Sequence, residues 1–321
     1  MMCLGEASSS AALVANDDAS NPDSDPAYHQ PWDGMAYPID PSSSSDSGND
    51  IIVDGRRFTV SRMARPHQVC ALRAAAAHID EPRGQIVMAC GTGKTLVGLW
   101  LTEMRVALRP TTAAVLVLFP NLMLIRQTLA TWMEHTSVSF SPLVVCSDAS
   151  VADSEECAGA TAEDFDIAVT TSADEITAFL QSGGGSGLQV VFATYQSAER
   201  VGDAQRLAGG GASFDLAIFD EAHKTAGSGS GLFSHALDEE NLAIGQRVFM
   251  TATPRISSRA ALSMDNAEVY GKVWYRLSFA EASAASRCPI TSRVERGDVT
   301  LPCIRQPSRA SLCRTKCCSS R

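Results

Sequence analysis

Seven short apolar segments recur between residues 85 and 251, and stretches of helical periodicity separate them. Several of these segments are rich in valine and isoleucine, and turn residues bound most of them, which is typical of buried strands. Strands that alternate with helices predict an α/β fold, with a parallel sheet covered by helices on both faces. The expected strands are Gln85–Ala89, Ala113–Phe119, Pro142–Cys146, Asp166–Thr170, Leu188–Ala193, Leu216–Phe219 and Arg247–Thr251.

Two of the expected helices carry recognisable start signals. Asn121 is a suitable N-cap for one helix, and Ser172 with Glu175 forms a capping-box pattern at the start of another. Each signal precedes apolar residues spaced to share one side of a helix. These apolar residues are Leu124, Ile125, Leu129 and Trp132 in the first helix, and Ile176, Phe179 and Leu180 in the second.

The two ends of the chain differ from the middle in composition. Residues 1–50 hold nine acidic residues and no lysine or arginine, whereas residues 287–321 hold eight basic residues against two acidic ones. Neither end has the large apolar residues or the periodicity of a folded element. We therefore expect a disordered acidic tail over residues 1–55, one folded domain over 56–286, and an irregular tail rich in arginine and cysteine over 287–321.

Composition limits the class of protein. The net charge of −10 argues against a passive basic coat for nucleic acid, although it allows an enzyme with a local basic groove. The sequence has no 18-residue apolar run and no secretory signal, so we expect no membrane span and an intracellular protein, in cytoplasm or nucleus. The ten cysteines are interpreted as reduced thiols, and the spacing of Cys313, Cys317 and Cys318 fits no zinc-ligand pattern.

The segment from Met88 to Thr95, Met-Ala-Cys-Gly-Thr-Gly-Lys-Thr, follows an expected strand and opens a helix. This context is typical of a phosphate-binding loop, although Met88 replaces the first glycine of the usual pattern. Backbone N–H groups of the loop and the helix N-terminus can bind phosphate, the lysine can reach the outer phosphates, and the last threonine can bind magnesium. The alternative is a glycine-rich turn with an exposed lysine. The candidate residues for ATP and Mg²⁺ are Gly91, Thr92, Gly93, Lys94 and Thr95.

A second candidate segment, Asp220-Glu221-Ala222-His223, follows the apolar run Leu216–Phe219. Carboxylates at the carboxyl end of a parallel strand lie where ligands bind in open α/β sheets. We expect Asp220 to hold Mg²⁺ and Glu221 to orient or deprotonate an attacking water. The alternative is a solvated acidic helix start, where Asp and Glu are favoured anyway. Lys94 and Asp220 each follow an expected strand, in the chain order of the two halves of a nucleotide site. Their joint presence favours a nucleotide site over the alternative.

Together these segments resemble the first motor domain of superfamily 2 helicases, in the branch that contains the helicase part of type III restriction enzymes. The resemblance covers about residues 62–285 and implies a RecA-like sheet and a DEAH-type ATPase. It also assigns Gln68, in Arg65-Pro66-His67-Gln68, to the adenine edge, with a polar helix start as the alternative. Thr251 and Thr253, in Thr-Ala-Thr-Pro, would couple the nucleotide site to the nucleic-acid face through the Asp220–His223 segment, in which His223 senses the nucleotide.

The same resemblance assigns two further strand ends to the nucleic-acid backbone. One is the segment Phe119–Gln127, where helix-start N–H groups and polar side chains can bind phosphate. The other is Phe192–Ser197, where a threonine binds phosphate or caps a helix. The alternative for the first segment is an ordinary connection between strand and helix. The assigned residues are Pro120, Asn121, Arg126, Gln127 and Thr194.

Helicases of this superfamily complete their ATP site with arginines from a second motor domain. Residues 287–321 are too few for another sheet, so we expect a second motor domain or another protein to complete the site. The function predicted is the ATP-binding domain of a DNA helicase or translocase, with DNA favoured over RNA by the restriction-enzyme-like branch alone. Two alternatives stay open: a module that binds ATP or nucleic acid without turnover, and a different phosphate-loop ATPase such as a transporter or recombinase.

Overall fold

The structure is a computed structural model that describes residues 49–108, 114–146, 169–182, 187–209, 212–227, 231–256 and 263–287. Its centre is an eight-stranded sheet with the order β10-β3-β9-β8-β4-β7-β5-β6, and every pair of neighbours is parallel. The strands are β3 (Arg83–Met88), β4 (Ala114–Phe119), β5 (Phe140–Val145), β6 (Val169–Thr170), β7 (Leu188–Thr194), β8 (Phe214–Phe219), β9 (Ile244–Thr251) and β10 (Lys272–Leu277).

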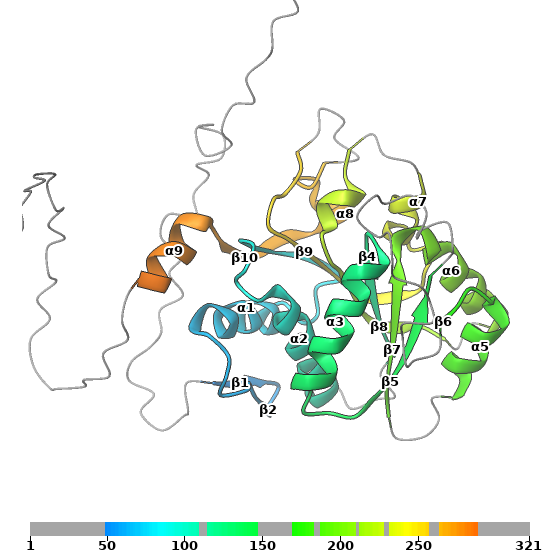
Figure 1. Cartoon of the computed structure of the whole chain (residues 1–321), viewed down its shortest axis with the longest axis horizontal. Coiled ribbons are helices and arrows are strands. Elements are labelled where there is room, and N and C mark those ends of the chain that lie inside the picture. Colours follow the sequence, from blue (N-terminus) through cyan, green and yellow to red (C-terminus); the bar gives the residue numbers. More distant parts are fainter. Residues whose placement is uncertain are drawn as a thin grey trace, which may run out of the picture.

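Helices cover both faces of this sheet, as the alternation of strands and helices predicted (Figure 1). The longer helices are α1 (Pro66–Ala77), α2 (Lys94–Leu108), α3 (Leu122–His135), α5 (Ala173–Gln181), α6 (Ala198–Leu207) and α9 (Phe279–Arg287). The short ones are η6 (Tyr195–Ser197), η7 (Ala222–Thr225), α7 (Gly231–Ser234), η8 (His235–Leu237) and α8 (Ala267–Tyr270).

The core consists of two apolar clusters, one on each face. In β4, Val115, Val117 and Phe119 point into the cluster beneath α1, α2 and α3, whereas Leu116 and Leu118 point into the cluster beneath α5 and α6. This alternation is the two-residue period of a strand. A strand buried on both faces needs apolar residues at every position, which explains the continuous apolar runs in the sequence.

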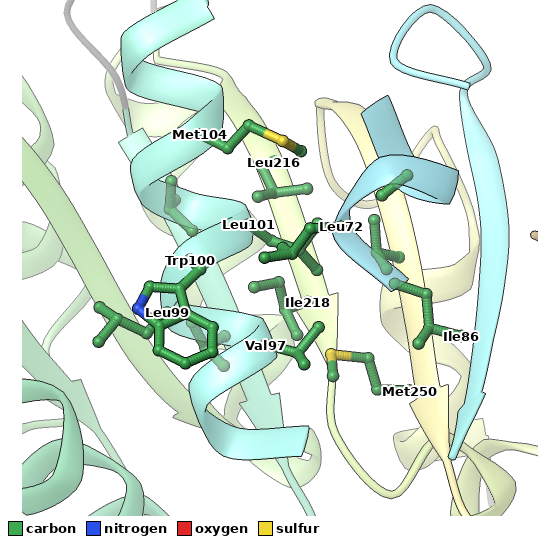
Figure 2. Close-up of a cluster of buried hydrophobic side chains, with 14 of the residues drawn as sticks. Leu72, Ile86, Val97, Leu99, Trp100, Leu101, Met104, Leu216, Ile218 and Met250 are labelled. Carbon is green, nitrogen blue, oxygen red and sulfur yellow. The ribbon is translucent and has the colours of Figure 1, made fainter. Parts of the chain in front are cut away.

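Helix α2 carries much of the first cluster. Figure 2 shows its side chains Val97, Leu101 and Met104 beside Leu216 and Ile218 of β8. Trp132 of α3 donates from its indole Nε1 to the carbonyl of Thr95 at 3.0 Å, so α3 also packs on the first turn of α2. The helix that follows the phosphate loop is therefore held firmly on the sheet.

Both expected N-caps are present. The Oδ1 of Asn121 accepts from the Leu124 amide at 3.0 Å, and the Oγ of Ser172 accepts from the Glu175 amide at 3.5 Å. All seven expected strands are confirmed within a few residues at their ends. Residue 113 and residues 166–168, which were assigned to two of them, lie outside the described residues.

The structure adds elements that the sequence analysis did not assign. Strand β10 forms the edge of the sheet beside β3, and Asp50–Val53 (β1) pairs antiparallel with Arg56–Thr59 (β2). Arg56 of this hairpin donates to the Leu108 carbonyl at the end of α2, at 2.7 Å. The folded part thus includes Asp50–Val53, so its expected start at residue 56 is placed several residues too late. Residues 1–48 of the expected acidic tail lie outside the described residues.

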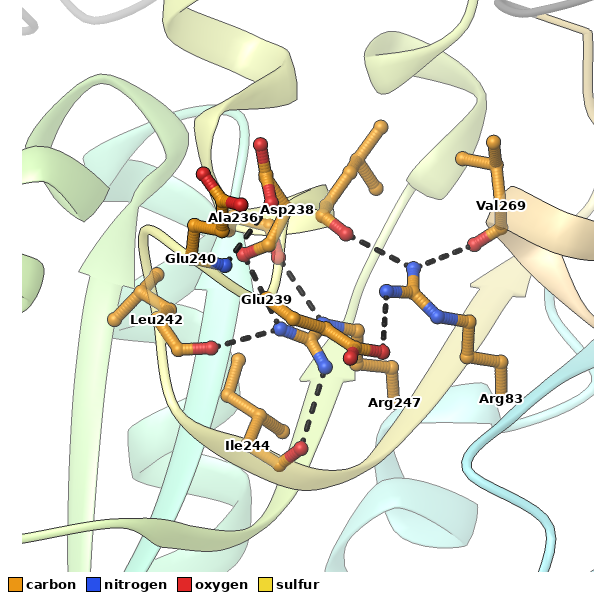
Figure 3. Close-up of polar contacts among 10 residues, drawn as sticks. Arg83, Ala236, Asp238, Glu239, Glu240, Leu242, Ile244, Arg247 and Val269 are labelled. Carbon is orange, nitrogen blue, oxygen red and sulfur yellow. Dashed lines mark hydrogen bonds and ion pairs between the residues drawn. The ribbon is translucent and has the colours of Figure 1, made fainter.

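Two arginines, Arg247, which is buried, and Arg83, which is partly buried, hold the amino edge of the sheet through hydrogen bonds to backbone carbonyls. Figure 3 shows the Arg247 guanidinium surrounded by the loop before β9, where it donates to the carbonyls of Ala236, Leu242 and Ile244 at 2.8–3.2 Å. Burial lowers the pKa of Arg247 to about 10. Arg83 donates to the Val269 carbonyl and forms an ion pair with Glu239, both at 2.9 Å. This edge is opposite the one where the candidate site lies.

Candidate nucleotide-binding site

The phosphate loop connects the end of β3 to the start of α2. Gly91 and Gly93 have φ of 75° and 86°, in the left-handed region that glycine adopts without a steric penalty. A side chain at Gly91 would meet open space. Lys94 is the first residue of α2, and its Nζ donates to the Met88 carbonyl at 3.3 Å. The loop therefore has two glycines in the left-handed region and a lysine at the start of the helix that follows, and its binding of phosphate stays a prediction.

The start of α1 packs directly against this loop. The Gln68 amide, only 2% exposed, donates to the carbonyls of Thr92 and Gly93, both at 3.2 Å. Its Oε1 accepts from the Arg65 amide at 2.7 Å, and His67 Nε2 lies 2.9 Å from the Thr92 carbonyl. In this structure the Gln68 side chain therefore hydrogen-bonds to the phosphate loop. Its expected contact with adenine stays a prediction.

The two carboxylates of the site follow β8. The Asp220 amide donates to the Leu118 carbonyl of β4 at 2.9 Å, which extends the sheet to the first acidic residue. Glu221 has φ 48° and ψ 46°, a left-handed conformation that is uncommon for residues other than glycine. Its amide donates to Oδ1 of Asp220 at 3.0 Å. The turn therefore places two carboxylates at the carboxyl edge beside the phosphate loop.

Lys94 and the two carboxylates interact electrostatically. Burial raises the pKa of Asp220 to about 6, and the negative Glu221 adds to this rise, whereas the Glu221 amide, Lys94 and His223 oppose it. The hydrogen bond from His223 lowers the pKa of Glu221, and Lys94 lowers it further. Glu221 is thus the more readily ionised of the two carboxyl groups. The positive charge of Lys94 lowers the pKa of both.

A histidine links this pair to the end of β9. His223 Nδ1 lies 3.3 Å from Oε2 of Glu221 and 3.1 Å from Oγ1 of Thr251. The same Thr251 hydroxyl accepts from the Thr253 amide at 3.2 Å. Thr251 has the hydroxyl contact with the acidic segment that the resemblance implied, whereas Thr253 joins through its backbone and its side chain is exposed. The coupling role of these residues stays a prediction.

The sheet order explains why these segments meet. Strands β3, β9, β8, β4 and β7 are consecutive neighbours and all parallel, so their carboxyl ends lie along one edge. That edge presents in turn the phosphate loop, Thr251, Asp220, Asn121 and Thr194. The topology thus brings together five motifs that the sequence spreads over more than 150 residues.

The residues assigned to nucleic acid have two different environments. Arg126 and Gln127 are exposed on the first turns of α3, and Pro120 and Asn121 are half-buried at its start. Thr194 is fully buried, and its hydroxyl donates to Oγ of Ser197 at 3.0 Å. The Thr194 side chain therefore makes no helix-cap bond in this structure, and its expected contact with phosphate stays a prediction.

Sequence reasoning missed Tyr195, the residue after Thr194. Its hydroxyl donates to the Asp220 carbonyl at 2.7 Å although the two residues are 25 positions apart. A tyrosine at the end of a buried strand was the only available signal.

Within the described residues no group of three or more His, Cys, Asp or Glu side chains forms a ready metal cluster.

Among the described helices, none is both long enough and apolar enough to cross a membrane. The fold and the phosphate-loop segment are those of a nucleotide-binding motor domain of the superfamily 2 helicase class. The family model of the type III restriction enzyme res subunit matches residues 62–256. The chain belongs to this family, and this domain is an ATP-binding helicase-type domain.

The solved structures that are similar to the chain include two type ISP restriction-modification enzymes. A nuclease-deletion mutant of the type ISP restriction-modification enzyme LlaGI, in complex with a DNA substrate mimic, is 33% identical over 69% of this chain, with a TM-score of 0.57. The ATP-dependent type ISP restriction-modification enzyme LlaBIII bound to DNA is 30% identical over 73% of this chain, with a TM-score of 0.59. The chain spans 20% and 16% of the lengths of these two proteins. A comparison with curated sequences gives no match.

Proposed function

We propose that this domain binds ATP with Mg²⁺, hydrolyses it, and couples hydrolysis to contact with DNA. The observation that carries the proposal is the meeting of Lys94, Asp220 and Glu221 at one edge of the sheet, where the lysine acts electrostatically on both carboxyls. A cation for phosphate, a carboxylate for metal and a second carboxylate for water are the parts of a phosphoryl-transfer site.

The residues present fit ATP and Mg²⁺. Gly91 and Gly93 have positive φ angles that glycine adopts freely, the space beside Gly91 is open to an approaching phosphate, and Lys94 begins the helix that follows the loop. Thr95 and Asp220 would hold the metal, which neutralises charge on the phosphates when bound. Hard oxygen ligands of this kind suit Mg²⁺.

In this proposal Glu221 acts on the attacking water. Its carboxylate is held by His223 and ionises readily, so it can orient a water and accept a proton from it. Lys94 and the backbone N–H groups of the loop would stabilise charge on the γ-phosphate. The Thr251 hydroxyl, through His223, connects this group to the end of β9.

DNA is the proposed nucleic acid because the two similar solved proteins were determined with DNA or a DNA mimic. Exposed Arg126 and Gln127 at the start of α3 support contact with the phosphate backbone rather than with bases. Such contact would be largely independent of sequence. Unwinding, cleavage and the other activities of these much longer proteins, of which the chain covers 20% and 16%, are not assigned to this domain.

The test is ATP hydrolysis by the purified chain with and without single-stranded DNA, followed over hours so that slow turnover is measured. Wild type should hydrolyse ATP faster with DNA, and Glu221→Gln should bind ATP normally but lose most of the hydrolysis. Glu240→Gln is the matched control, because Glu240 is an exposed carboxylate after η8. Normal ATP binding without hydrolysis in wild type would support a module without turnover. Equal rates in wild type and Glu221→Gln would refute the role of Glu221.

A further inference from the structure

The peptide group between Asp220 and Glu221 is held at both ends. Its carbonyl oxygen, that of Asp220, accepts from the Tyr195 hydroxyl at 2.7 Å. Its N–H, that of Glu221, donates to Oδ1 of Asp220 at 3.0 Å. Two hydrogen bonds on opposite ends of one planar group fix its orientation. That orientation sets ψ of Asp220 and φ of Glu221.

The conformation fixed in this way is an unfavourable one. Glu221 has φ 48° and ψ 46°, and residues other than glycine keep such angles only where the surroundings impose them. If the carbonyl of Asp220 lost its partner, the peptide could rotate and relieve the backbone of Glu221. The Glu221 carboxylate would then move relative to Lys94 and the phosphate loop.

Tyr195 is well built to hold this carbonyl. It is 1% exposed, and its ring lies against Phe233 and Phe219, with centroid distances of 5.7 and 6.3 Å. Burial raises the pKa of its hydroxyl, with the charge of Asp220 as a second cause, so the group stays a donor. Tyr195 follows β7 and Asp220 follows β8, with β4 between them, so the side chain spans the end of a whole strand.

We propose that Tyr195 is a positioning residue for ATP hydrolysis, which fixes the Asp220–Glu221 peptide and through it the carboxylate that acts on water. This inference rests on the proposed function of Glu221. The segment after β7 would then influence the ATP site through the hydrogen bond from Tyr195 to the Asp220 carbonyl. In the described contacts, no side chain of that segment touches the phosphate loop. A purely structural tyrosine would affect stability and leave the turnover rate alone.

The test compares Tyr195→Phe with Tyr270→Phe. Tyr270 is also fully buried on the same face of the sheet, and its hydroxyl bonds to Oγ1 of Thr225 at 3.1 Å, away from the Asp220 carbonyl. Each variant loses one buried hydroxyl and keeps its ring. Tyr195→Phe should lower kcat by about 10- to 100-fold, the range expected for a misplaced catalytic group, with KM for ATP within about twofold of wild type. Tyr270→Phe should leave both unchanged.

Amide hydrogen exchange gives a second readout that does not need turnover. The Glu221 amide should exchange at least about tenfold faster in Tyr195→Phe than in wild type or Tyr270→Phe. Phe233→Leu, which keeps the hydroxyl but removes the ring packed on it, should change kcat in the same direction, and it replaces Tyr195→Phe if that variant does not fold.

Three results would overturn the proposal: unchanged kcat in Tyr195→Phe, a rise in KM alone, or unchanged exchange at Glu221. If wild type itself has no turnover, the proposed hydrolysis fails, and the exchange of Glu221 alone decides whether Tyr195 holds this peptide.

Discussion

Three glycines of the phosphate loop and of α2 allow a graded test of the loop geometry. Gly91 has φ 75° and open space where a Cβ would lie, so Gly91→Ala adds backbone strain alone, about 1–2 kcal/mol. Gly93 has φ 86°, and a Cβ there would lie 2.3 Å from Nε2 of Gln68. Gly93→Ala therefore adds the same strain and also displaces the Gln68 amide from two carbonyls. At about 0.5–1.5 kcal/mol for each lost bond, the total cost is about 2–5 kcal/mol.

Gly98 is the control. It lies within α2, and a Cβ there would lie 3.4 Å from the Trp132 ring, an ordinary contact distance. Because alanine favours helix over glycine by about 1 kcal/mol, Gly98→Ala should be neutral or slightly stabilising. Urea unfolding gives the free energies of unfolding, and equal m-values would show that the variants unfold from comparable states.

A Gln68→Ala background separates the two contributions at Gly93. With the amide removed, Gly93→Ala should cost no more than Gly91→Ala, because only strain remains. The reasoning would be refuted if Gly93→Ala and Gly91→Ala were equally stable with Gln68 present. It would also be refuted if Gly98→Ala were as damaging as either of them.

Three further predictions concern the core, the coupling and the DNA contact. Gly84→Ala would place a Cβ 1.9 Å from the Trp274 indole, so the free energy of unfolding measured in urea should fall by about 1–3 kcal/mol. Gly231→Ala is the control, because the space around Gly231 is open and the free energy of unfolding should change little. Thr251→Val removes the hydroxyl bonded to His223, so ATP binding should persist while the ratio of hydrolysis rates with and without DNA falls to near one; a normal ratio would contradict the coupling role. DNA binding should be sequence-independent and weaken with salt, and Arg126→Gln should reduce the salt slope by about one; an unchanged slope would exclude Arg126 as a phosphate contact.

The central strands could be predicted because a sheet buried on both faces leaves continuous apolar runs in the sequence. Strand β10 leaves no such run. Exposed Lys272 and Arg276 interrupt its apolar residues, and its register with β3 shifts between Val273 and Tyr275. The hairpin β1–β2 is short and carries charged residues. Both contribute contacts that depend on the finished fold, such as the stacking of Trp274 on His78.

The two central segments of the candidate site, Gly91–Thr95 and Asp220–His223, could be located from the sequence because each is a short pattern after a strand, and the strand order brings them to one edge of the sheet. Their chemical roles stay predictions. Contacts between distant segments could not be predicted. The Gln68 amide on the phosphate loop and the Tyr195 hydroxyl on Asp220 depend on how α1 packs and on the strand order β8-β4-β7. The burial of Thr194 follows from the same packing, and a local motif cannot indicate it.

The most direct test of the central claim is a Mg-ATP binding titration of wild type, Lys94→Ala and Lys272→Ala. Lys272 is the matched control, since it is an exposed lysine at the amino end of β10, remote from the phosphate loop. The account predicts that wild type and Lys272→Ala bind ATP with the same affinity, while Lys94→Ala loses at least about tenfold in affinity without a change in unfolding free energy, because a half-exposed lysine contributes little to packing. Equal ATP affinity in all three proteins would contradict the assignment of residues 88–95 as the phosphate loop.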